Sequence, residues 1–123
     1  MRVGESQLRK GAIELIALGL LASCPSYGGQ LVERFRDEAG LEVSAGTLYP
    51  LLACLRKSGL VVTVWEESPV GPPRKIYELA EAGKTRLLQM RSEWEVLNAA
   101  VERTAKKGVG SNVTAEDDTT LVA

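Results

Sequence analysis

The stretch "VSAGTLYPLL", residues 43–52, combines a helical pattern of leucines with two residues that disfavour helices. The leucines of this region repeat at intervals of three and four, which predicts an amphipathic helix capped by Ser44: Leu48, Leu51, Leu52 and Leu55. Gly46 and Pro50 lie four residues apart in its first turns, although glycine disfavours a helix interior by about 1 kcal/mol and proline by about 3 relative to alanine. Because Gly46 has no β-carbon, it lowers the strain from the proline ring, and we expect an irregular first turn.

The face of this helix opposite the leucines contains no carboxylate. It combines small residues, a phenol and late cations: Gly46, Tyr49, Ala53 and Arg56, with Lys57 beside them. No Asp or Glu occurs in residues 43–65, and residues 43–77 contain four cations and two acids, a net of +2. An acid-free face suits contact with a polyanion, with the hydroxyls of Ser44, Thr47 and Tyr49 facing phosphates or base edges. Packing against another subunit is an equally open explanation of this face.

Two further helices precede this one. Residues 8–22 are apolar on nearly every side, so we expect this first helix to be central and covered. Residues 27–39 form the second helix, with Ser26 as its N-cap and Gly40 as the left-handed residue that ends it. We expect its charged residues to face water: Glu33, Arg34, Arg36, Asp37 and Glu38.

A β-hairpin follows the third helix. Residues 60–65 are largely β-branched, and residues 74–79 form a second strand across a loop rich in Pro and Gly. Residues 71–73, "GPP", stiffen the tip. Arg74 and Lys75 stand at its base, where they can meet a sugar-phosphate backbone. A rigid hairpin with solvated ends is the alternative.

The last periodic segment, residues 81–103, is predicted to be a long helix. Its apolar residues recur at intervals of three and four: Leu87, Met90, Trp94, Leu97 and Val101. This heptad spacing is typical of paired helices, so we predict a dimer interface along it. Trp94 is either a packing anchor in this seam or the wall of a pocket for a flat aromatic effector, with Met90 as a neighbour. Residues 106–123 lack periodicity, and we expect a disordered tail.

Composition limits the function classes. The chain has 123 residues, 25% of them charged, which allows one modest domain, and its net charge of −1 gives no global attraction to DNA or to a membrane. Without histidine, Ser-His-Asp and Cys-His catalysis and a Cys/His zinc site are impossible. There is also no phosphate-binding glycine loop and no clustered carboxylate set. We therefore expect neither an enzyme nor a cofactor or metal.

The cysteines and the apolar runs bear on location. Cys24 and Cys54 lie within apolar runs, and we expect them to be small buried residues in a reducing compartment. The longest apolar run, "AIELIALGLLA", is interrupted by Glu14 and is too short to span a bilayer. We expect a cytoplasmic protein without membrane association.

The order of elements is three helices, a two-stranded ribbon and one long helix, which is the winged helix-turn-helix arrangement. We therefore expect a mostly α protein with a small β-hairpin. Residues 1–79 are the expected DNA-binding domain, and residues 80–105 the expected C-terminal dimerisation helix.

The sequence resembles the PadR family of transcriptional regulators. The resemblance runs in register from residue 8 to about residue 103, through "LRKGAIELIALGLLA", "SYGGQLVERF", "VSAGTLYPLLACLRKSGLV", "EESPVGPPRKIYELAEAG" and "RSEWEVL". Among these, "GTLYPLL" and "GPPRKIYEL" are specific, and they occur together at the right distance. The chain departs from the pattern at Ala80, where the family usually has Thr or Ser; the lost N-cap costs about 1 kcal/mol.

The resemblance implies a homodimer that binds operator DNA, usually as a repressor. It also implies that small molecules can relieve this repression. The single final helix is similar to that of the smaller branch of the family. The resemblance and the acid-free face of the third helix together imply this set of DNA-binding residues: Tyr27, Ser44, Gly46, Thr47, Tyr49, Arg56, Lys57, Arg74 and Lys75. A winged-helix module that binds protein is the alternative, and the net charge of −1 is consistent with it.

Overall fold

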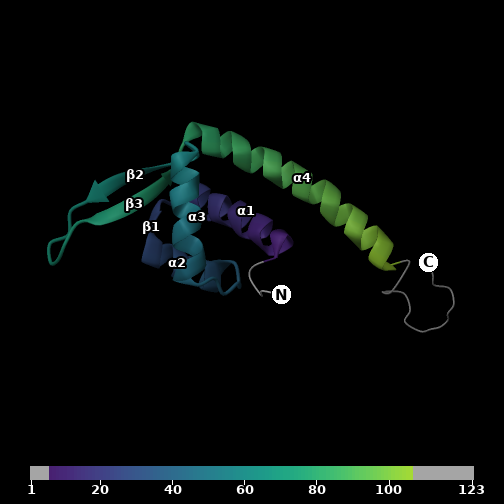
Figure 1. The fold of residues 1–123 in the computed structure, drawn as a ribbon, viewed down its shortest axis with the longest axis horizontal. Helices are drawn as coiled ribbons and strands as arrows, with labels where there is room; N and C mark the ends of the chain where they lie inside the picture. The colour runs from purple at the N-terminus through teal and green to yellow at the C-terminus, as the bar shows by residue number, and fades with distance from the viewer. Residues whose placement is uncertain (1–5, 107–123) are drawn as a thin grey trace. The chain divides into compact units, whose positions relative to one another are not determined.

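The computed structural model describes residues 6–106, and its helices and strands follow the predicted order. Figure 1 shows them along the chain: α1 (Gln7–Ser23), β1 (Ser26–Tyr27), α2 (Gly28–Glu38), α3 (Ala45–Lys57), β2 (Val61–Glu66), β3 (Arg74–Leu79) and α4 (Glu81–Ala105). The chain divides into two compact units, one ending at Leu88 and one beginning at Gln89. The predicted class, mostly helical with a small hairpin, is confirmed.

Apolar side chains from α1, α2, α3 and the sheet form the core of the first unit. The buried apolar residues are Ile13, Ala17, Leu18, Leu20, Leu21, Leu31, Phe35, Val43, Leu48, Leu52, Leu55, Val61 and Tyr77. Burying a side chain of this kind stabilises the fold by roughly 1.5–3 kcal/mol. The helix α1 is central, as expected, because it packs against both α2 and β3, but it is not covered on every side: Leu8 is 75% exposed. Of the four leucines that predicted α3, three are buried and Leu51 is half-buried.

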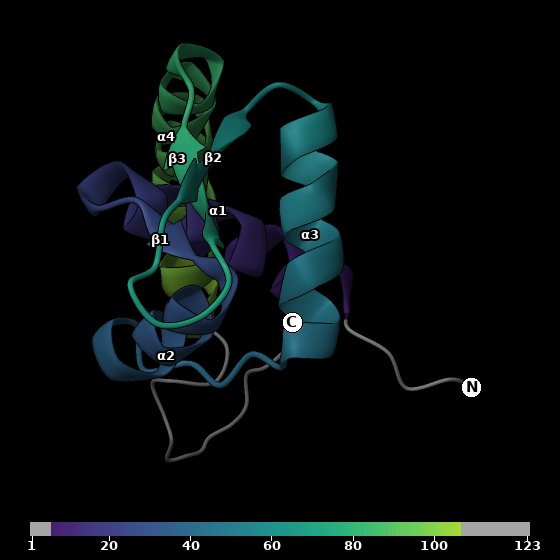
Figure 2. The same ribbon diagram turned by 90° about the vertical axis from the view of Figure 1, so that its left-hand side faces the viewer.

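The helix α3 runs without a break through Pro50, so the predicted irregular first turn is wrong. Ser44 closes that turn: its Oγ accepts a hydrogen bond from the Thr47 amide at 3.2 Å, and its carbonyl accepts one from the Leu48 amide at 2.9 Å. At the other end, Gly59 adopts φ +81°, and the Leu60 amide donates back to the Leu55 carbonyl at 2.9 Å. Figure 2 shows α3 upright, with its C-terminal end leading into β2.

The sheet has three strands in the order β1-β3-β2, all antiparallel. The hairpin β2–β3 was predicted, whereas β1 was not, because two residues are too short for an alternating pattern. Ser26 is fully buried in β1, so its predicted role as the N-cap of α2 is wrong. That position belongs to Tyr27, whose amide donates to Oε1 of Gln30 at 3.4 Å.

Both cysteines are exposed, which contradicts the expectation that they are buried. Cys24 is the C-terminal capping residue of α1, where the helix has already ended. Cys54 follows the buried Leu52 by two positions on α3, and two positions correspond to about 200° around a helix. The apolar run therefore contains residues that point in opposite directions.

The helix α4 contains 25 residues and begins after Ala80. In its first turn, Gly83 is buried so closely that an added β-carbon would overlap the Leu60 carbonyl oxygen. From Gln89 onward, the side chains of α4 are exposed in the protomer, apart from the half-buried Met90. The expected tail, residues 106–123, lies outside the described residues except for Lys106. No helix within residues 6–106 is long and apolar enough to cross a membrane.

Candidate nucleic-acid interface

The acid-free stripe of α3 lies open at the surface of the protomer. Gly46, Ala53, Arg56 and Lys57 are exposed, and Tyr49 in the middle of the stripe is 45% exposed. The opposite face of α3 contributes Leu48, Leu52 and Leu55 to the core. We call the exposed, acid-free stripe the free face of α3. The free face has small residues near its start and two cations in its last turn.

The position of the Tyr49 ring depends on a glycine at the start of α2. Gly28 is buried, and a β-carbon there would overlap the Tyr49 ring, 2.7 Å from its Cζ and its hydroxyl oxygen. On its other side, the ring lies near Tyr77 of β3. Burial raises the pKa of the Tyr77 phenol, and the nearby Tyr49 phenol adds to the rise, whereas the Arg56 guanidinium opposes it. The ring of Tyr49 is thus positioned by α2 and the sheet while half of it stays exposed.

Two of the predicted hydroxyl contacts are used within the protein. The Ser44 hydroxyl caps α3 and donates to Oγ1 of Thr47 at 3.3 Å. Thr47 is half-buried and, together with Gly46 and Pro50, lines a groove between α1 and α3. Ser44 therefore sets the start of the helix, and Thr47 lies at the edge of the free face toward α1.

The two cations of the hairpin lie on opposite faces of the ribbon, because consecutive strand residues alternate. The Arg74 guanidinium carbon lies 4.6 Å from the centre of the Tyr27 ring. The Lys75 ammonium lies 5.8 Å from the centre of the Trp65 ring. The sequence predicted both cations at the base of the hairpin tip but did not assign them to different faces of the ribbon. Each is now paired with a different aromatic ring, and the Arg74 pair links the hairpin to the start of α2.

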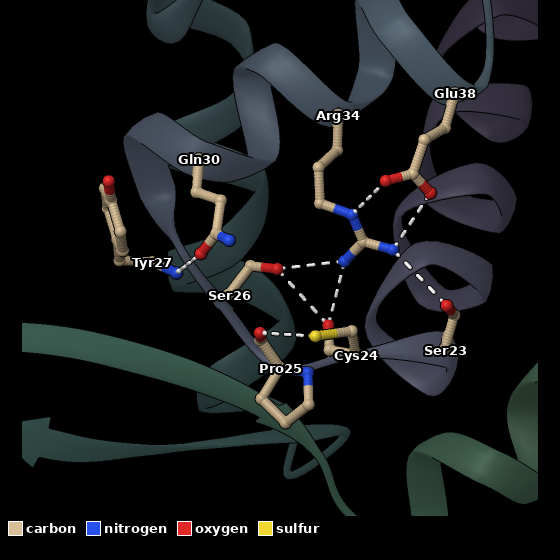
Figure 3. A network of polar contacts seen from close by, with 8 residues as sticks. All are labelled: Ser23, Cys24, Pro25, Ser26, Tyr27, Gln30, Arg34 and Glu38. Carbon is tan, nitrogen blue, oxygen red and sulfur yellow. Dashed lines mark hydrogen bonds and ion pairs between the residues drawn. The ribbon is translucent and has the colours of Figure 1, made fainter.

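Arg34 was predicted to face water, and this is wrong: it is only 9% exposed. Figure 3 shows its guanidinium at the centre of a polar network that joins α1, β1 and α2. Nε and Nη2 donate to the two carboxylate oxygens of Glu38 at 2.7 and 3.1 Å. Nη1 donates to the Cys24 carbonyl and to the Ser26 hydroxyl, both at 2.9 Å, and Nη2 reaches the Ser23 hydroxyl at 3.4 Å.

This network holds the short connection that carries Tyr27. The hydrogen bond to Glu38 raises the pKa of Arg34, against the opposing effect of burial, and the same hydrogen bond lowers the pKa of Glu38. A sequence signal was present: Arg34 follows the buried Leu31 by three positions, so both lie on one side of α2. The helical periodicity could not identify Ser23 and Ser26, whose hydroxyls accept hydrogen bonds from Arg34 where α1, β1 and α2 meet.

The predicted dimer residues form an uncovered apolar row on α4. Trp94, Leu97 and Val101 are 44%, 53% and 60% exposed in the protomer, and Leu87 and Met90 are half-buried. Apolar side chains at this spacing on one helix are expected to be covered by a partner, because isolated surface helices place polar residues there.

Comparison with known proteins assigns the chain to a family. The sequence model of the "Transcriptional regulator PadR-like family" matches residues 17–89, more than half of the chain. A search of curated proteins found no match. Among solved structures, a PadR-like transcription factor from Bacteroides fragilis is 39% identical, with a TM-score of 0.70, and the match covers 80% of this chain and 95% of that one.

Two further structures agree. A transcriptional regulator from Streptococcus is 36% identical, with a TM-score of 0.74, over 81% of this chain and 98% of that one. A PadR family transcriptional regulator from Eggerthella lenta is 32% identical, with a TM-score of 0.73, over 81% and 87%. The winged-helix fold and the resemblance inferred from the sequence are thereby confirmed: this chain belongs to the PadR-like family of transcriptional regulators.

Proposed function

We propose that the protein binds specific sites in duplex DNA as a homodimer and represses transcription there. The observation that carries this proposal is the exposed face of α3, which has no carboxylate and has two cations in its last turn. A helix of this kind fits the major groove, where small residues allow close approach and polar side chains reach base edges. The family consists of transcriptional regulators, and the proposal assigns no catalytic activity.

The proposed DNA contacts divide into two groups. The first lies at the start of α2 and on α3: Tyr27, Ser44, Gly46, Thr47, Tyr49, Arg56 and Lys57. The second is the pair Arg74 and Lys75 on the hairpin, the wing of the fold. Because these two lie on opposite faces of one ribbon, they suit contact with the two strands that border a groove. Phosphate contacts of this kind set register, and base-edge contacts set specificity.

We further propose that residues 1–79 form the DNA-binding domain and residues 80–105 the dimerisation helix. The uncovered row Leu87, Met90, Trp94, Leu97 and Val101 supports this division. A helix of 25 residues is roughly 37 Å long, comparable with the roughly 34 Å that separates half-sites one turn apart on DNA. Each protomer supplies one recognition helix, so specificity requires the pair.

A protein that binds operator DNA must reach that DNA, so we propose that this protein is cytoplasmic.

The proposal also includes a small aromatic effector. Trp94, 44% exposed, and Met90 are its proposed contacts, and simple packing in the dimer explains the same exposure. An effector releases repression only if it binds the DNA-incompetent form more tightly. In a Trp65→Phe protein, Trp94 is the sole tryptophan. Its emission should change with planar aromatic compounds, and indifference to a broad panel would favour packing alone.

The decisive experiment selects tight-binding sequences from random duplexes of roughly 30 base pairs, enough for two half-sites. The affinity of the selected duplex is then measured at several salt concentrations. Phosphate contacts release counterions, so the logarithm of the affinity should fall linearly with the logarithm of the salt concentration. The alternative, a protein-binding module, draws support from the net charge of −1. Failure to enrich any sequence, with no salt-dependent binding, would favour that alternative.

A further inference from the structure

Trp65 is the most exposed aromatic residue in the described part of the chain. It is 68% exposed, compared with 45% for Tyr49 and 44% for Trp94. It lies near the tip end of β2, beyond the buried Val61 at the start of that strand. A tryptophan contributes most when its large ring is covered, so an exposed one on a protruding hairpin marks a contact surface.

Strand alternation separates the hairpin into two faces of different charge. The face of Trp65 also contains Val61, Thr63, Lys75, Tyr77 and Leu79, and none of these is acidic. The other face contains Glu66 and Glu78, directly across from Arg74 and Val62 respectively. The absence of carboxylates that distinguishes the free face of α3 therefore continues onto one face of the wing only.

Tyr77 of β3 lies near both of these acid-free regions. This residue lies on the Trp65 face of β3, and its phenol is close enough to Tyr49 and Arg56 of α3 for both to influence its pKa. Tyr49 and Arg56 belong to the free face of α3. Tyr77 is itself buried, and the two exposed regions beside it, the free face of α3 and the Lys75–Trp65 end of the wing face, both lack carboxylates.

We propose that Trp65 is a DNA-contacting residue of the wing, with its indole packed against the sugar-phosphate backbone beside the groove that receives α3. In the free protein, the ring holds the Lys75 ammonium at 5.8 Å. On binding, the ammonium moves to a phosphate, and the ring covers the adjoining sugars. The pair thereby adds an apolar contact to an ionic one on the same face. This inference rests on the proposed function.

The test uses a duplex selected with the full wild-type chain. Trp65→Ala should weaken its binding by about tenfold, with the salt dependence unchanged, because an indole releases no counterion. Lys75→Ala should reduce the log–log salt slope by about 1. Val62→Ala is the matched control: Val62 is 45% exposed on the same strand but on the opposite face, so this variant should bind like wild type.

Tryptophan emission gives a second readout. Wild type and Trp65→Phe are titrated with the selected duplex in parallel, and the difference between them reports Trp65 alone. Its emission should change on binding, and its quenching by acrylamide should fall. Wild-type affinity in Trp65→Ala together with an unaffected Trp65 signal would overturn this inference and leave the proposed function standing. A Trp65→Ala protein that loses its dimer would overturn it too, in favour of a contact with a second copy. Absence of any duplex binding by wild type would overturn both.

Discussion

At the residue scale, Gly28 determines where the Tyr49 ring can lie. The glycine is buried at the start of α2, and an added β-carbon would overlap the far end of the ring. That end of a tyrosine side chain can swing away with little strain in the backbone. A methyl group at residue 28 therefore displaces the phenol without removing it, which makes this position a sensitive probe of the α3 face.

We predict that Gly28→Ala weakens binding of the selected duplex by about tenfold while the free energy of unfolding changes by less than about 1 kcal/mol. Titration of labelled duplex and urea unfolding measure the two quantities. Gly29→Ala is the matched control, because a β-carbon there would lie 3.6 Å from the Tyr27 ring, an ordinary contact. In a Tyr49→Ala background, Gly28→Ala should have no further effect on affinity. Additive losses would show that Gly28 does not act through Tyr49.

The ion pair of Arg34 and Glu38 predicts an acid-sensitive junction. The hydrogen bond lowers the pKa of Glu38 in the folded state, so its contribution to stability is complete above the ordinary carboxyl value of 4.5. That contribution is lost as pH falls through the lower, folded pKa. The stability difference between wild type and Glu38→Gln, measured by urea unfolding, should therefore shrink between about pH 6 and about pH 3. A difference that is constant with pH would contradict this assignment.

Single residues were predicted least well. The helical period correctly identified the buried leucines of α3, because spacing alone determines which residues share a face. It failed for Arg34, whose burial depends on acceptors at Ser23 and Ser26 in other elements. It failed for Cys24 and Cys54, since apolar neighbours in sequence do not determine which way a side chain points.

At the element scale, helix and strand bounds followed from local signals. Helix periodicity, the Ser44 cap and the Pro-Gly loop predicted α1 to α4 and the hairpin to within about two residues, the usual uncertainty of helix ends. The strand β1 was missed because its two residues pair with β3 about 50 positions later, a contact that no local pattern records. The same limit hid the contact of Gly28 with Tyr49.

The start of α4 allows a stabilising substitution. Ala80 precedes the helix and its carbonyl accepts from the Lys84 amide at 3.0 Å, but its side chain cannot cap the first turn. Ala80→Ser should raise the free energy of unfolding by about 1 kcal/mol, measured in urea. Ala82→Ser is the matched control: it places the same side chain inside the helix, where serine is worse than alanine by about 0.5 kcal/mol. Equal effects of the two substitutions would show that capping is not responsible.

At the scale of the whole molecule, specific DNA binding as proposed requires two protomers. Leu97 is 53% exposed in the protomer and lies on the proposed seam, so Leu97→Asp should give monomers that lose specific DNA binding. Val96→Asp is the matched control, because Val96 is 68% exposed on the same helix but off the seam. Sedimentation distinguishes the outcomes. A stable Leu97→Asp dimer would remove the seam from the account.

The proposed function depends above all on contact between the free face of α3 and duplex DNA, and Tyr49 is the middle residue of that face. The most direct measurement is the affinity of Tyr49→Ala for the selected duplex at the same salt concentration as wild type, with the mass of both proteins measured by sedimentation. We expect binding weaker by about tenfold or more and an unchanged mass. Wild-type affinity in this variant would contradict it.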